Sequence, residues 1–76
     1  MMKGGVMTPA ETTAYKDMIR AMTDDALDAE TRKVIRQDGE YKAILIQLVY
    51  TEWMNRGKGE RFVKAYNQGV LQQSHK

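Results

Sequence analysis

Apolar residues are most concentrated in residues 40–56. Ten of the fourteen residues from Tyr41 to Met54 are apolar. On a helix with 100° between residues they cover about two thirds of the circumference, wider than the ~100° stripe of an ordinary surface helix. A β-strand is the alternative for residues 43–50, but the apolar pattern continues beyond them and no second strand is evident. We therefore predict a helix over residues 40–56 that other elements cover from at least two sides.

A helix is also predicted from Thr8 onward. Thr8 can cap it, Pro9 suits the first helical position, and Glu11 can accept a hydrogen bond from the N–H of the cap. Apolar residues then recur at steps of three and four, so that one face can meet a core. They are Ala14, Tyr15, Met18, Ile19 and Met22. We expect this helix to end near Met22.

Between Thr23 and Asp28, several side chains can bind nearby backbone N–H groups, which favours a turn followed by a helix cap at Asp28. A short helix over residues 29–37 follows, with an acidic start and a basic end, as the helix dipole prefers. Gly39 then interrupts the chain, because glycine readily adopts the left-handed conformation that stops a helix.

Residues 57–59 form a glycine-containing break, and helical spacing resumes over residues 60–68. Gly69 is followed by an apolar residue, which suits a helix stop. A last helix is therefore predicted to end at this glycine.

The chain is predicted to be all-α, a small domain of three to four helices around the apolar helix at 40–56. We expect one domain over residues 8–71, with short connections that make consecutive helices antiparallel, and flexible tails at residues 1–7 and 72–76. A monomer of this size buries only about 60% of the surface that its unfolded chain exposes. Self-association is therefore expected to add stability.

The composition limits what else can stabilise the fold. Cysteine is absent, so neither a disulfide nor a thiolate zinc site is available, and we expect a cytoplasmic location. The longest apolar run, at residues 43–46, is far shorter than the ~18 residues of a membrane span, and no signal-peptide pattern is seen. Residues 1–41 carry six basic and eight acidic groups, whereas residues 42–76 carry six basic and two acidic groups. The C-terminal half is therefore basic.

Side chains suited to catalysis are scarce. The only histidine is His75 and the only serine is Ser74, so no Ser–His or Cys–His pair can be built within a folded element. Four carboxylates lie close together in the sequence, at Asp24, Asp25, Asp28 and Glu30. Their spacing does not match a calcium loop, and capping and solvation are the favoured roles. We predict a non-enzymatic protein with no cofactor, no metal ion and no small-molecule substrate.

One concentrated basic segment is the candidate nucleic-acid-binding site. It contains Arg56, Lys58, Arg61 and Lys64. Arg61 and Lys64 share one helix face, and the other two cations precede it, so all four can converge on phosphates. The favoured alternative is a solvated face with a Glu60–Lys64 pair, because the net charge of +2 is small for a nucleic-acid-binding domain. Nucleic-acid binding is therefore the second function hypothesis.

Tyr41, Tyr50, Trp53 and Met54 are the candidate partner-binding residues, because aromatic residues and methionine are enriched where proteins meet. A homodimer through this helix is one arrangement, and an intramolecular core flanked by the first and last helices is the other. The leading hypothesis is a small interaction or regulatory protein that binds a protein partner. Its size, methionine content and lack of catalytic residues suit an accessory protein of a bacteriophage or another mobile element.

Overall fold

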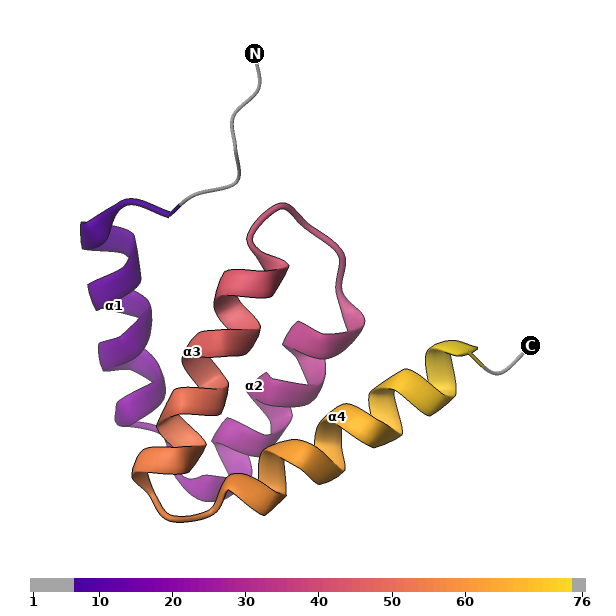
Figure 1. Ribbon diagram of the computed structural model, residues 1–76. Coiled ribbons are helices and arrows are strands. Elements are labelled where there is room, and N and C mark those ends of the chain that lie inside the picture. Colours follow the sequence, from indigo (N-terminus) through magenta and orange to yellow (C-terminus); the bar gives the residue numbers. More distant parts are fainter. Residues whose placement is uncertain (1–6, 75–76) are drawn as a thin grey trace.

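The computed structural model describes residues 7–74 of the chain, and these residues form helices and no strand. The helices are α1 (Pro9–Arg20), α2 (Asp24–Arg36), α3 (Lys42–Asn55) and α4 (Gly59–Ser74) (Figure 1). The all-α class predicted from the sequence is confirmed. The Cα atoms extend over 34 × 33 × 16 Å, so the domain is a flat body about two helices thick.

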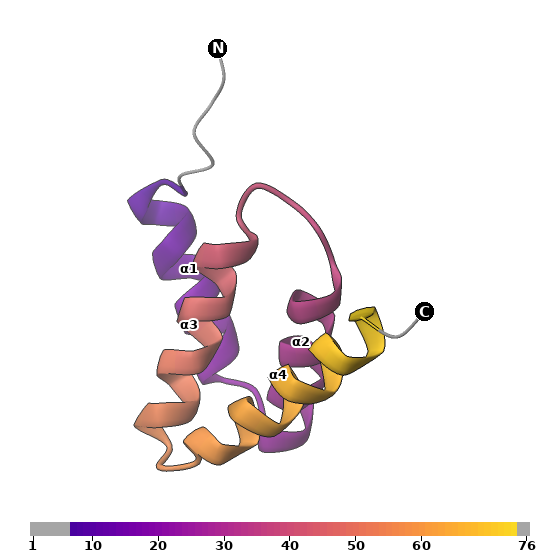
Figure 2. The ribbon, with the colours of Figure 1, turned by 45° about the vertical axis from the view of Figure 1, so that its right-hand side comes forward.

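The helices form two consecutive hairpins whose turns lie at the same end of the domain (Figures 1 and 2). Residues 21–23 join α1 to α2, and residues 56–58 join α3 to α4. Consecutive helices run in opposite directions, so α1 is parallel to α3 and α2 is parallel to α4. α3 contacts each of the other helices, but the most extensive contact in the domain joins the parallel pair α2 and α4.

The start of α1 is capped as the sequence predicts. Thr8 Oγ1 accepts a hydrogen bond from the N–H of Glu11 at 3.1 Å, and Glu11 Oε1 accepts one from the N–H of Thr8 at 3.0 Å. Pro9 occupies the first helical position. Two N–H groups that a helix start would otherwise leave unpaired are thereby satisfied. The helix ends at Arg20, slightly before the predicted end at Met22.

The predicted start of α2 is wrong, because the helix begins at Asp24 and not at residue 29. Its cap is Thr23, whose Oγ1 accepts a hydrogen bond from the N–H of Ala26 at 3.2 Å. Asp28, the predicted cap, lies inside the helix and pairs with Arg32 at 2.8 Å. The earlier start also places carboxylates in the first turn, where they interact favourably with the helix dipole.

The predicted stop of α4 at Gly69 is also wrong, because the helix continues through this residue. Gly69 is buried, and a Cβ atom there would lie 2.5 Å from Cγ2 of Ile35. Glycine at this position therefore permits the close approach of α4 to α2. The predicted C-terminal tail begins too early, since residues 72–74 belong to α4. Residues 1–6 and 75–76 of the predicted tails lie outside the described residues.

The core encloses Trp53 completely, with 0% of the residue exposed. Its Nε1–H donates a hydrogen bond to Thr31 Oγ1 at 3.0 Å, and the Thr31 hydroxyl donates one to the backbone oxygen of Leu27 at 2.7 Å. Both polar groups are thus satisfied within apolar surroundings. All four helices contribute apolar side chains to the buried interior: Ile19, Leu27, Val34, Ile35, Val49, Trp53, Phe62 and Ala65.

We expect Gly69→Ala to destabilise the fold. Ile35 is buried and β-branched, so its side chain has one strongly preferred rotamer in a helix and cannot easily turn away from an added methyl group. The free energy of unfolding should fall by about 1–2 kcal/mol, after allowance for the ~1 kcal/mol that alanine gains in helix propensity. Urea denaturation followed by circular dichroism measures the change.

Gly39→Ala is the matched control, because no atom lies within 4 Å of a Cβ built at Gly39, and the left-handed conformation predicted there is wrong, since its φ is not positive. Its stability should be unchanged or slightly increased. A Gly69→Ala protein as stable as the wild type would contradict close packing of α4 on α2.

Candidate functional site

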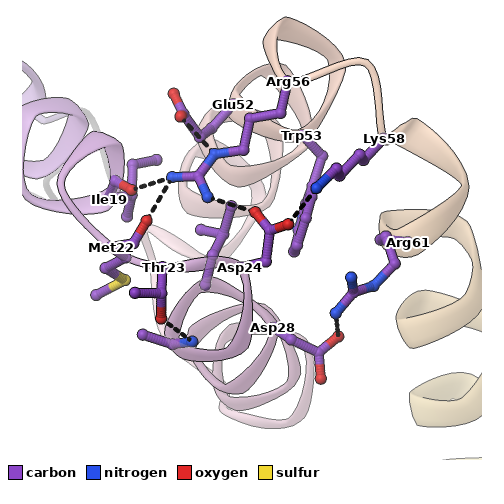
Figure 3. A network of polar contacts seen from close by, with 12 residues as sticks. Ile19, Met22, Thr23, Asp24, Asp28, Glu52, Trp53, Arg56, Lys58 and Arg61 are labelled. Carbon is purple, nitrogen blue, oxygen red and sulfur yellow. Dashed lines mark hydrogen bonds and ion pairs between the residues drawn. The ribbon is translucent and has the colours of Figure 1, made fainter.

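Arg56, the first of the predicted nucleic-acid-binding residues, is bound within the protein (Figure 3). Its Nε donates to Glu52 Oε2 at 2.8 Å, and its Nη1 donates to Asp24 Oδ1 at 2.8 Å. Its Nη2 donates to the backbone oxygens of Met22 at 2.8 Å and Ile19 at 3.0 Å. These carbonyl groups belong to the end of α1 and the turn after it, where a helix leaves acceptors without partners. One guanidinium therefore ties the turn between α1 and α2 to α3.

Two further residues of the predicted basic site also face carboxylates of the protein. Lys58 Nζ donates a hydrogen bond to Asp24, and Arg61 Nη2 lies 4.0 Å from Asp28 Oδ1 (Figure 3). Lys64 is exposed and has no hydrogen bond or ion pair with another residue in the part of the chain that the structure describes. The four cations therefore do not form one free basic surface.

Three of the four carboxylates near the start of α2, those of Asp24, Asp28 and Glu30, have structural partners. Asp24 accepts hydrogen bonds from Lys58 and Arg56. Both bonds lower the pKa of its carboxyl group, and the bond from Lys58 has the larger effect. Glu30 Oε2 accepts a hydrogen bond from the Tyr15 hydroxyl at 2.7 Å. Burial of Tyr15, together with this bond, raises the pKa of the phenol, which stays protonated at neutral pH. Within residues 7–74, no three histidine, aspartate or glutamate side chains gather as metal ligands would.

The prediction that Trp53 belongs to a partner-binding surface needs correction. The tryptophan is 0% exposed and lies on the side of α3 that the other helices cover, so it offers no surface to a partner. Tyr50 and Met54, by contrast, are 40% and 52% exposed. Tyr41 is half-buried just before α3, where it lines a shallow groove with residues of α1. The structure thus places only Tyr50 and Met54 together at the surface.

Tyr50 and Met54 share this surface with residues of α4. The Phe62 ring lies edge-on to the Tyr50 ring with centroids 5.1 Å apart, and it stacks on the Tyr66 ring at 5.8 Å. Met54 lies against Gly59, where a Cβ atom would come within 2.5 Å of the sulfur. We call the surface formed by Tyr50, Met54, Phe62, Val63 and Tyr66 the aromatic face.

The aromatic face gathers most of the large apolar side chains exposed on the described part of the chain. Four of the five belong to it, and Met18 on α1 is the other. The α4 members were not among the predicted site residues, because their spacing was used only to predict a helix over residues 60–68. The signal for them was the spacing of Phe62, Val63 and Tyr66, which places all three on one side of a helix.

Comparison with known proteins gives no relative, since no protein-family model, no curated protein and no solved structure matches the chain. Within residues 7–74, no helix has both the length and the apolar character needed to cross a bilayer. Function must therefore be inferred from the surfaces of the fold itself.

Arg56→Lys should destabilise the protein although it keeps the positive charge. A lysine ammonium is a compact charge and cannot reproduce the planar set of donors that binds Glu52, Asp24 and two backbone carbonyls. We expect the free energy of unfolding to fall by about 2–3 kcal/mol in urea denaturation.

Arg20→Lys serves as the control, because Arg20 is an exposed residue whose side chain has no ion pair among the described residues. Its effect should stay within about 0.5 kcal/mol. Equal effects of the two substitutions would show that Arg56 does not join the hairpins.

Stability should also depend on the ionisation of Asp24. Because the pKa of this carboxyl is lower in the folded protein than in the unfolded chain, its contribution is complete above the unfolded pKa and is lost as the pH falls through the folded pKa. We expect Asp24→Asn to be less stable than the wild type at about pH 6, and the difference to shrink towards about pH 2. Urea denaturation across this range measures it, and a difference independent of pH would contradict the ion pairs.

Proposed function

We propose that this chain is a small, non-enzymatic interaction protein that binds through its aromatic face, and that its partner on this face is a second copy of itself. The single observation that carries the proposal is that the rings of Tyr50 and Tyr66, both exposed, pack on Phe62, with exposed Met54 and Val63 on the same two helices. A regulatory role, a cytoplasmic location and a bacteriophage or mobile-element source stay predictions from composition alone.

The chemistry of the aromatic face supports a protein partner. Tyrosine and methionine are enriched at the centres of protein interfaces, where the rings lose water over a large area and the hydroxyl groups can still form hydrogen bonds. Single exposed apolar residues are ordinary on protein surfaces, but a contiguous group of them is not. The exposed members project from both α3 and α4, so they form a broad patch and not a single ridge.

A second copy fits this face for two reasons. A two-fold dimer sets the same patch against itself, and the five side chains of the aromatic face carry no charge that would be repelled by its own image. In addition, a flat domain with a shortest extent of 16 Å has little interior of its own, and pairing enlarges the apolar volume withdrawn from water. Both features favour a symmetric partner over one that must bring complementary charges.

The double variant Tyr50→Ala/Met54→Ala tests this surface, because it removes apolar area at two exposed positions and spares the buried Phe62 and Trp53. We expect the wild type to sediment as a reversible dimer. In the double variant the association constant of the dimer should fall by at least about 100-fold, as is common when central interface residues are removed. Sedimentation equilibrium over a range of concentrations provides the measurement.

Met18→Ala is the matched control, since Met18 is 44% exposed on α1, away from the aromatic face. It should leave the dimerisation constant unchanged. Wild type that stays monomeric at high concentration would exclude the second copy as partner, and equal weakening by Met18→Ala would show that a different surface pairs.

A further inference from the structure

A second surface lies where the parallel helices α2 and α4 meet along one edge of the domain. A small groove there is lined by Arg32 and Arg36 of α2 and by Ala65 and Gly69 of α4. Ala65 and Gly69 form the α4 side of the groove, and both arginines line its α2 side. We call this groove the arginine groove. It is separate from the aromatic face and contains no residue that the sequence singled out for binding.

The two arginines of the groove differ in their contacts. Arg32 is held in place, because its Nε donates to Asp28 Oδ2 at 2.8 Å and its Nη1 donates to Gln68. Arg36 is exposed, and neither a hydrogen bond nor an ion pair joins it to another residue within the described range 7–74. One guanidinium is therefore fixed by the fold, and its neighbour has its donors available for a ligand.

Further cations extend the positive charge along α4. Arg61 lies at the Asp28 end of the groove, and Lys64 lies one helical turn from both Arg61 and Gln68. Two carboxylates lie near these four cations: Asp28 contacts both Arg32 and Arg61, and Glu60 precedes Lys64 by one helical turn. The edge therefore keeps an excess of positive charge that the protein does not neutralise itself.

We infer that the arginine groove and this row of cations bind the phosphate backbone of a nucleic-acid strand. Arginine presents a planar fork of donors that matches phosphate oxygens. The groove has a volume of about 70 Å³ and is lined by both arginines, so an anion that enters it meets Arg32 and Arg36.

The arrangement of the cations favours a strand over an isolated anion. Arg32 and Arg36 are four residues apart, which separates them by ~6 Å along α2, similar to the spacing of successive phosphates along a strand. On the neighbouring helix, Lys64 is exposed, whereas Arg61 lies 4.0 Å from Asp28 and 5.1 Å from the ring centroid of Trp53. This site differs from the basic segment predicted from the sequence, because Arg56 and Lys58 are used within the fold and α2 supplies the two arginines of the groove.

The test uses the full chain and fluorescence anisotropy with a labelled single-stranded DNA of about 20 nucleotides, at several salt concentrations. We expect binding that weakens steeply as salt increases. Arg36→Glu should weaken it by at least about tenfold and lower the slope of log affinity against log salt by about 1. The control is Arg20→Glu, which makes the same charge change at an exposed arginine in the last turn of another helix.

Arg36→Gln and Arg20→Gln form a second pair that avoids charge reversal, and thermal unfolding confirms that each variant is folded. Absence of binding by the wild type at low salt, or equal losses in the Arg36 and Arg20 variants, would overturn the inference. If inorganic phosphate displaces the DNA at the same concentration of phosphate groups, the groove binds a free anion and the inference of a strand is wrong. If polyglutamate competes as well as an unlabelled oligonucleotide of the same charge, the groove does not distinguish phosphate from carboxylate, and the inference is also wrong.

Discussion

The guanidinium of Arg56 is the contact on which the relative placement of the two hairpins depends. The turn after α1 is short, and the carbonyl groups of Ile19 and Met22 point to a side chain that arrives from α3. Asp24 and Glu52 balance its charge at 2.8 Å each. Removal of the cation would leave two carboxylates and two backbone carbonyl groups without their donor, so the whole group is required together. Both turns of the domain are thereby fixed at one end.

This arrangement decides which side chains remain for binding. Arg56 and Lys58 are used to join the hairpins, and Trp53 lies beneath them with the guanidinium carbon of Arg56 5.8 Å from its ring centroid. The remaining surface of α4 is apolar on the side of Tyr66, which stacks on Phe62. It is cationic on the side where α4 meets α2. α4 therefore separates two surfaces of different chemistry, and it belongs to both.

Local signals in the sequence predicted the parts of the fold that local contacts determine. The cap at Thr8 depends on residues within one helical turn, and it was predicted. Thr23 and Asp28 are both good caps, and the choice between them depends on the burial of Leu27 against other helices, which no local pattern reveals. Gly69 has the same ambiguity, because a glycine that stops a helix and one that admits a neighbouring helix look alike in sequence. For Arg56, the charge is visible in the sequence, but all its partners except Glu52 lie more than thirty residues away.

The alternating order of the helices has a consequence for how the chain folds. The contact between α2 and α4 joins residues such as Arg32 and Gln68, which are 36 positions apart, and the intervening helix must turn back before these residues can meet. Likewise, the indole of Trp53 finds its hydrogen-bond acceptor in the other hairpin. Neither hairpin holds a core by itself, so the loop between them must close before most of the burial is gained. The chain is therefore built to fold as one cooperative unit, and its two halves depend on each other for their structure.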